Sequence, residues 1–218
     1  PSVEGHDIPG WVNASVLTVY AQHGITAAYW QVSYEPVDYD ASPDVPAHDV
    51  VFLANCSSAE RREFGKLLQS MPGINVGLYG RGWQYGNGDC TYNFPVATAI
   101  YQNARIAIGD NQYGDRHGFV SNRIFEALAS GAFLLHQTIP GLEDLTGIVD
   151  GTHYVSWSDE SDLQTKIKHW LQPRHQEKRR AIADAGRDYV RAHHSFDVRV
   201  QELFRLVQQK VKPKSDAA

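Results

Sequence analysis

Short apolar runs alternate with helical stretches along most of the chain from residue 48 onward. The runs have the length and composition of buried strands, and the stretches between them place apolar residues on one face, as helices do. This alternation predicts parallel β-α-β units. The expected strands are 49–54, 74–79, 105–108, 132–135 and 152–155, and the expected helices are 59–71, 96–103, 122–130, 159–171, 175–193 and 196–210.

The first 45 residues differ from the rest. They contain one helical stretch, 14–23, and one strand-like run, 27–32, followed by a link rich in Pro and Asp. One helix and one strand cannot bury a core of their own. We therefore expect this segment to pack on the main domain or on a part of the protein outside this chain. The last residues, 213–218, are expected to be frayed.

The composition is that of an ordinary globular protein, with 218 residues, 42% of them hydrophobic and 21% charged. No run approaches the roughly 18 apolar residues that a membrane helix needs. The N-terminus lacks the basic start and apolar core of a signal peptide. Cys56 and Cys90 are too few for a disulfide framework and have no metal-ligand spacing. We therefore expect a cytoplasmic protein.

The net charge of −5 is unevenly distributed, because acidic residues predominate up to residue 173 and basic residues predominate after it. A basic end can face nucleic acid or an anionic membrane. Here acidic residues are interleaved with the basic ones, which favours solvated helix faces. We therefore expect no nucleic-acid partner.

Three loops are candidates for ligand binding. In an open parallel sheet, ligands bind beyond the carboxyl ends of the strands. The loops 55–58, 80–88 and 109–122 follow strands in this way. They contain glycines, which permit close backbone approach, and arginines, which pair with phosphate.

The segment 121–132 is the most informative. As a helix, it places Arg123 and Glu126 on one stripe. A helix start offers free N–H groups and partial positive charge to a phosphate, and Arg123 adds a cation there. Glu126 lies about one turn deeper, roughly 5 Å along the axis, where a carboxylate can accept hydrogen bonds from ribose hydroxyls. The alternative is an ordinary surface ion pair between Arg123 and Glu126.

This segment, Ser-Asn-Arg-Ile-Phe-Glu-Ala-Leu-Ala-Ser-Gly-Ala, and the Ile-Pro-Gly-Leu-Glu at 139–143 resemble the C-terminal domain of group 1 glycosyltransferases. The chain looks most similar to the CgeB-like branch, the spore maturation protein B type. The similarity takes in Leu-Tyr-Gly-Arg-Gly-Trp at 78–83 and the segment 100–108, and it covers about residues 45–207.

The resemblance implies a GT-B glycosyltransferase with two Rossmann-like domains, of which the C-terminal one holds a nucleotide sugar of the UDP or GDP type. Glu126 matches the glutamate that binds the ribose of this donor. The donor phosphates are expected near Ser121, Asn122 and Arg123. The resemblance also implies that no metal ion or other cofactor is needed, because cations and helix N-termini stabilise the leaving diphosphate.

Other residues complete the expected site. Arg81 is a second candidate phosphate contact, and Gly80 and Asn55 begin two of the candidate loops. Trp83 is the candidate for stacking on a sugar or base. Trp170 is assigned to the core.

One position departs from the family pattern. Related retaining enzymes carry a Glu-x7-Glu pair, but Gly118 stands eight positions before Glu126. His117 beside it could replace the missing carboxylate as a hydrogen-bonding group, or it could be a solvated loop residue. The stereochemistry of transfer is therefore left open.

We accordingly expect residues 1–45 to be the end of an acceptor-side domain with its link, and residues 46–212 to be the nucleotide-sugar-binding domain. No catalytic base is assigned, because it would lie in the acceptor-side domain. The expected activity is hexose transfer to an unknown acceptor. The alternatives are a non-catalytic GT-B-like binding or scaffolding module and an epimerase or phosphorylase of the same fold. A dehydrogenase is disfavoured, because the Gly-Arg-Gly at 80–82 lacks the third glycine of a dinucleotide motif.

Overall fold

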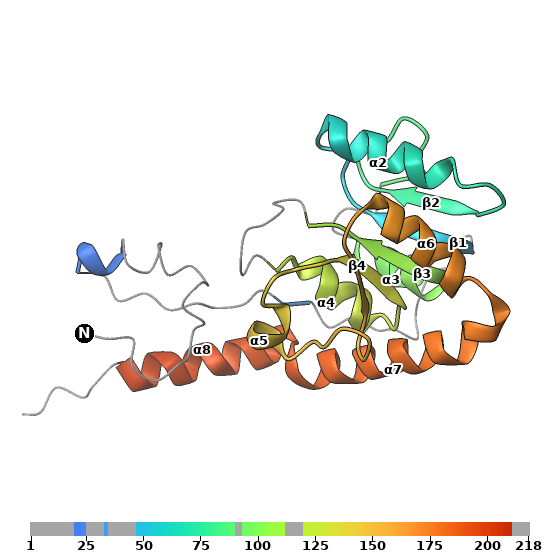
Figure 1. Ribbon diagram of the computed structural model, residues 1–218. Helices are drawn as coiled ribbons and strands as arrows, with labels where there is room; N and C mark the ends of the chain where they lie inside the picture. The colour runs from blue at the N-terminus through green and yellow to red at the C-terminus, as the bar shows by residue number, and fades with distance from the viewer. Residues whose placement is uncertain (1–19, 25–32, 35–46, 90–92, 112–119, 211–218) are drawn as a thin grey trace, which may run out of the picture.

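The computed structural model describes residues 20–24, 33–34, 47–89, 93–111 and 120–210 (Figure 1). These residues form a five-stranded parallel sheet with strand order β2-β1-β3-β4-β5. The strands are β1 (His48–Leu53), β2 (Val76–Tyr79), β3 (Ala104–Gly109), β4 (Leu134–Gln137) and β5 (Val155–Trp157). This is the expected α/β, Rossmann-like fold.

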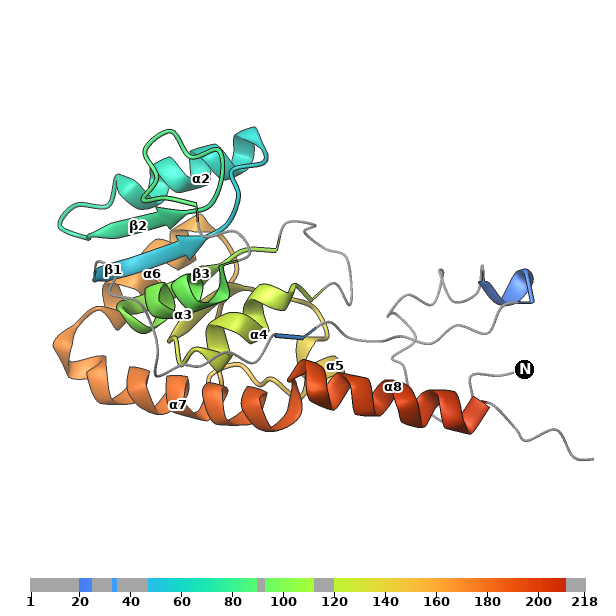
Figure 2. The ribbon, with the colours of Figure 1, turned by 180° about the vertical axis from the view of Figure 1, so that it is seen from behind.

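Helices cover both faces of the sheet, with α2 and α6 on one face and α3 and α4 on the other (Figures 1 and 2). Within the described ranges, none of the helices is long and apolar enough to cross a membrane. The helices are α2 (Ala59–Gln69), α3 (Phe94–Gln102), α4 (Asn122–Ala129), α5 (Leu142–Thr146), α6 (Glu160–Trp170), α7 (Gln176–His193) and α8 (Phe196–Lys210), with a 3-10 turn at Pro173–His175.

Side chains of β1 alternate between two hydrophobic cores. Val50 and Phe52 belong to the core under α2 and α6, whereas Val51 and Leu53 belong to the core under α3 and α4. Burial on both faces is why the strand reads as a continuous apolar run. Leu53 is in register with Tyr79 of β2, and Phe52 is in register with Ile108 of β3, so these three strands end at the same edge of the sheet.

Several elements differ from their predicted positions. β2 begins two residues later than expected, and α3 begins two residues earlier. β4 begins two residues later than expected, after a turn at Gly131 that has a left-handed φ of 81°. β5 occupies 155–157 instead of 152–155, because residues 151–153 form a turn and Tyr154 forms an isolated bridge with Asp150. α5 was not predicted, since it has only five residues and lies between Gly141 and Gly147, which both adopt left-handed φ angles.

Of the first 45 residues, the structure describes 20–24 and 33–34. Residues 20–22 are helical, within the expected helix 14–23. Tyr34 forms a parallel bridge with Ser195, and its carbonyl oxygen accepts a hydrogen bond of 3.2 Å from the amide of Phe196 at the start of α8. The expected strand at 27–32 and the tail at 213–218 lie outside the described residues.

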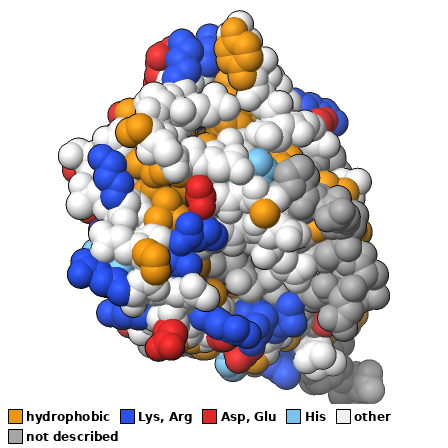
Figure 3. Space-filling view, turned by 90° about the vertical axis from the view of Figure 1, so that its right-hand side faces the viewer, with side chains coloured by type: hydrophobic (Ala, Val, Ile, Leu, Met, Phe, Trp, Pro, Cys, Tyr) orange, Lys and Arg blue, Asp and Glu red, His pale blue; other side chains and the backbone are white. Residues whose placement is uncertain are grey.

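The basic C-terminal part of the chain carries acidic side chains among its basic ones. Asp184 of α7 lies within 3.8 Å of Arg180 and within 2.6 Å of Arg187. On the face of the molecule in Figure 3, Asp and Glu side chains likewise lie among Lys and Arg. This arrangement agrees with the expected solvated helix faces.

Candidate functional site

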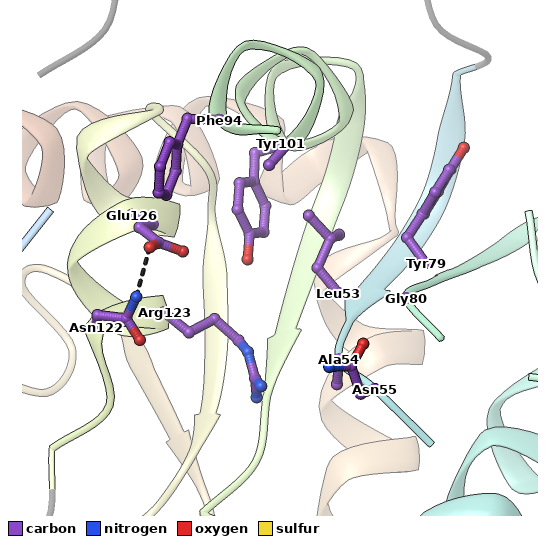
Figure 4. Close-up of a pocket in the computed structure, with 11 residues that line it drawn as sticks. Leu53, Ala54, Asn55, Tyr79, Gly80, Phe94, Tyr101, Asn122, Arg123 and Glu126 are labelled. Carbon is purple, nitrogen blue, oxygen red and sulfur yellow. Dashed lines mark hydrogen bonds between the residues drawn. The ribbon is translucent and has the colours of Figure 1, made fainter. Parts of the chain in front are cut away.

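A cavity of about 270 Å³ opens at the carboxyl edge of the sheet (Figure 4). The ends of β1 and β2 form one wall, and α3 and α4 form the other. Five residues expected from the sequence line this cavity, and the aromatic residues that share it were not identified from the sequence. The lining residues are Leu53, Ala54, Asn55, Tyr79, Gly80, Phe94, Ala97, Tyr101, Asn122, Arg123 and Glu126.

The start of α4 forms the polar side of this cavity. Ser121 is the N-cap, and its hydroxyl oxygen accepts a hydrogen bond from the amide of Arg123 at 3.3 Å. A serine at this position satisfies one of the free amide groups of a helix start. Ile124, Phe125 and Leu128 are fully buried. They anchor α4 in the core while Arg123 reaches the cavity.

Asn122 holds the carboxylate of Glu126. The Nδ2 of Asn122 donates a hydrogen bond of 2.6 Å to Oε1 of Glu126 (Figure 4). Burial raises the pKa of Glu126, and the charge of Arg123 and the bond from Asn122 oppose that rise. Arg123 pairs with Asp110 and not with Glu126. The surface ion pair between Arg123 and Glu126 that the sequence left open therefore does not form.

Asp110, the residue after β3, binds two arginines. Its Oδ1 accepts a hydrogen bond of 2.7 Å from Nη1 of Arg123, and its Oδ2 accepts one of 2.9 Å from Nε of Arg61. The Arg61 side chain is 6% exposed and that of Arg123 is 20% exposed. The sequence did not predict that Arg61 belongs to the site. Arg61 and Arg62 are adjacent in α2, and no local pattern indicates that one is buried and the other exposed.

The loops after β1 and β2 lie in close contact. Gly80 has a left-handed φ of 128°, and a Cβ there would lie 2.4 Å from the carbonyl oxygen of Ala54. The amide of Arg81 donates a hydrogen bond of 2.9 Å to Oδ1 of Asn55. The guanidinium of Arg81 pairs with Asp89 at 2.9 Å and is largely exposed, so this side chain is not part of the cavity lining.

Trp83 packs against the core and does not line the cavity. Its Nε1 donates a hydrogen bond of 2.6 Å to the carbonyl of Ala54, and its ring meets that of Phe52 edge-on. A Cβ on Gly65 of α2 would lie 2.4 Å from the indole, so the glycine makes room for it. Trp170 is buried, as expected. His117 lies outside the described residues.

A second cavity, of about 410 Å³, lies between the starts of α2 and α6. Arg61 and Asp110 line it, whereas Arg123 lines the first cavity. The three paired side chains therefore extend from one cavity to the other along the edge of the sheet.

Comparison with known proteins identifies the family. A family model described as glycosyl transferase-like matches residues 61–205. A search of curated proteins finds no match.

Several solved structures have a similar fold. Anabaena HepE in complex with UDP and glucose has a TM-score of 0.62 at 14% identity, with 90% of this chain and 62% of that chain covered. Sucrose-phosphate synthase from Thermosynechococcus elongatus has a TM-score of 0.57 at 14% identity, covering 90% and 56%. An S. aureus TarM mutant in a complex that contains UDP has a TM-score of 0.59 at 12% identity, covering 89% and 42%.

The chain thus spans less than two thirds of the length of these solved structures. At such low identity, the structural likeness concerns the fold alone. The family model, in contrast, matches well over half of the sequence and includes β2, α3 and α4 of the cavity wall. The chain belongs to the glycosyl transferase-like family.

Proposed function

We propose that this chain binds a nucleoside diphosphate sugar at α4 and is the donor-binding half, residues 46–212, of a GT-B glycosyltransferase. The observation that carries this proposal is that a cation, Arg123, and a carboxylate, Glu126, lie on one capped helix and line the same cavity. The family assignment supports a transferase. Two of the similar structures are complexes that contain UDP, which supports this donor class.

The arrangement suggests how the donor would lie. The diphosphate would meet the start of α4, where the positive end of the helix dipole and the guanidinium of Arg123 provide positive charge. The ribose would lie one turn deeper, with its hydroxyls donating to Glu126. The base would lie along the wall that contains Phe94 and Tyr101.

The same groups would assist departure of the nucleoside diphosphate. Negative charge develops on the leaving diphosphate as the sugar bond breaks, and fixed positive groups stabilise that charge without a metal ion. We accordingly propose a reaction that needs no metal or other cofactor. The proposed acceptor-side domain, of which residues 1–45 would be the last part, would supply any catalytic base. Within the family, the segments 78–83 and 121–132 favour the CgeB-like branch.

Calorimetric titration of the chain with UDP, GDP, ADP and dTDP tests the proposal. We expect one nucleotide to bind, and we expect Glu126→Ala and Arg123→Ala each to weaken its binding by about 10-fold or more, because each removes a hydrogen-bonding charged group. Arg105→Ala is the matched control, since Arg105 pairs with Asp49 at the amino ends of β3 and β1, away from the cavity. A folded chain that binds none of the four nucleotides would instead support the scaffolding alternative.

A further inference from the structure

A chain of hydrogen bonds connects two of the candidate loops through Arg61. Nη1 of Arg61 donates a bond of 3.0 Å to the carbonyl oxygen of Asn55 after β1. Its Nε and Nη2 donate to Oδ2 of Asp110 after β3, at 2.9 and 2.5 Å. Oδ1 of Asp110 then accepts the bond from Arg123. One buried guanidinium therefore sets the position of the carboxylate that Arg123 contacts.

The two arginines that share Asp110 differ in what they leave available. All three nitrogens of the Arg61 guanidinium donate hydrogen bonds within the protein, and its side chain is almost fully buried. Among the described residues, the guanidinium of Arg123 donates only to Asp110, and it lines the cavity. The remaining N–H groups of Arg123 are thus available for a ligand, whereas those of Arg61 are used inside the protein.

Both guanidinium groups also lie near one aromatic ring. Their central carbons are 5.9 Å (Arg61) and 6.0 Å (Arg123) from the centroid of Phe52, which is fully buried. An arginine side chain has several rotatable bonds, and ordering it on binding costs affinity. Contact with Asp110 and Phe52 orders Arg123 before any ligand arrives. Two arginines and one aspartate leave a net positive charge, which favours an anion.

From this geometry we infer that Asp110 and Arg61 are positioning residues, which hold Arg123 in the orientation that binds the diphosphate of the donor. The inference rests on the proposed function, because it takes the cavity at α4 to be the donor site. On this inference, Asp110 and Arg61 strengthen binding of the diphosphate and have no effect on binding of the nucleoside. The nucleoside part of the ligand would be bound by other residues.

The test compares UDP with uridine, whose binding can be followed by ligand-observed NMR, in the chain and in Asp110→Asn. We expect the dissociation constant of UDP to rise about 10-fold, while that of uridine changes less than about 2-fold. In the Arg123→Gln background, Asp110→Asn should weaken UDP binding no further, because Asp110 acts through Arg123. Asp110→Glu, which restores the charge, should recover part of the affinity for UDP.

Two further variants guard against an effect of misfolding. Asp110→Asn leaves Arg61 buried without its counter-charge, which can unfold a protein. The double variant Arg61→Met with Asp110→Asn removes both buried charges and should show the same selective loss of UDP binding. Asp49→Asn is the matched control, because Asp49 pairs with Arg105 across the same two strands at their amino ends and should leave UDP binding unchanged.

The outcomes separate this inference from the proposed function. If the parent chain binds UDP and Asp110→Asn binds it equally well or more tightly, Asp110 does not position Arg123 and the inference is wrong. An equal loss of UDP and uridine binding would make Asp110 a general structural residue, which also overturns it. If the folded parent chain binds neither UDP nor another nucleoside diphosphate, the proposed function fails, and the inference fails with it.

Discussion

Asn122 and Glu126, one helical turn apart on α4, are joined by a hydrogen bond of 2.6 Å from the side-chain amide to the carboxylate. This bond lowers the pKa of Glu126 against the effect of burial, which raises it. We therefore predict that Asn122→Ala raises the pKa of Glu126 further. Asn122 is exposed, so the fold should persist. An NMR titration of the Glu126 carboxyl carbon measures the change, and an unchanged or lower pKa would show that the bond does not form in solution.

Ionised Glu126 should destabilise the folded chain at neutral pH. Its pKa in the folded chain is raised, so the folded state holds the proton more tightly than the unfolded state does. The free energy of unfolding therefore falls as pH rises through the two pKa values and is lowest above the pKa of the folded state. We predict that Glu126→Gln is more stable than the parent near pH 7 and that the difference disappears below about pH 4. Urea unfolding at the two pH values measures it, and a destabilised variant at pH 7 would contradict the prediction.

Gly80 keeps the loops after β1 and β2 in contact, and alanine there should be strongly destabilising. Gly80→Ala combines a left-handed φ with a clash against Ala54, whereas Gly88 has a similar φ of 133° and nothing within 4 Å of an added Cβ. Gly88→Ala should therefore cost about 1–3 kcal/mol from backbone strain alone. Gly80→Ala should cost a further 1–3 kcal/mol, roughly, because neighbouring atoms must move. Chemical denaturation compares the two, and equal losses would argue against the close contact.

His194 should make the chain sensitive to acid. Its Nε2 donates to the carbonyl of Thr146 at 2.8 Å, and its Nδ1 accepts from the guanidinium of Arg199, so the neutral ring fits both partners. Burial, reinforced by the charge of Arg199, lowers the pKa of His194 to about 4. Since the folded pKa lies below the unfolded value of 6.5, stability is present above pH 6.5 and is lost as pH falls toward 4.

Protonation of His194 should lower the free energy of unfolding by about 3 kcal/mol. The buried His136 has a pKa lowered to about 4 as well and should add a loss of the same sign. We predict that His194→Asn, which keeps an acceptor but cannot take up a proton, flattens the fall in the free energy of unfolding. Urea unfolding at several pH values measures the slope. A slope equal to that of the parent would exclude His194 as a source of the sensitivity.

Features encoded within a few neighbouring residues were predictable from the sequence. β1 is a continuous apolar run because both of its faces are buried, and α4 begins where Ser121 can cap it. The expected convergence of three loops followed from parallel strands alone, and the cavity is lined by Asn55, Gly80 and Asn122, one residue from each expected loop.

Features that depend on distant residues were not predictable. Arg61 and Asp110 are 49 residues apart, and the sequence does not indicate that α2 turns this arginine inward. Trp83 resembled a stacking residue because it follows a glycine-rich turn. The structure instead packs it on Phe52, since Gly65 of α2 leaves space for the indole. Such contacts depend on how α2 lies on the sheet.

A crystal structure of this chain with the nucleoside diphosphate that binds best in the titration would test the proposed donor site directly. We expect electron density for the diphosphate at the start of α4, in contact with Arg123, and for the ribose hydroxyls within hydrogen-bonding distance of Glu126. A nucleotide bound in another cavity, or one whose ribose lies away from Glu126, would contradict the proposed donor site.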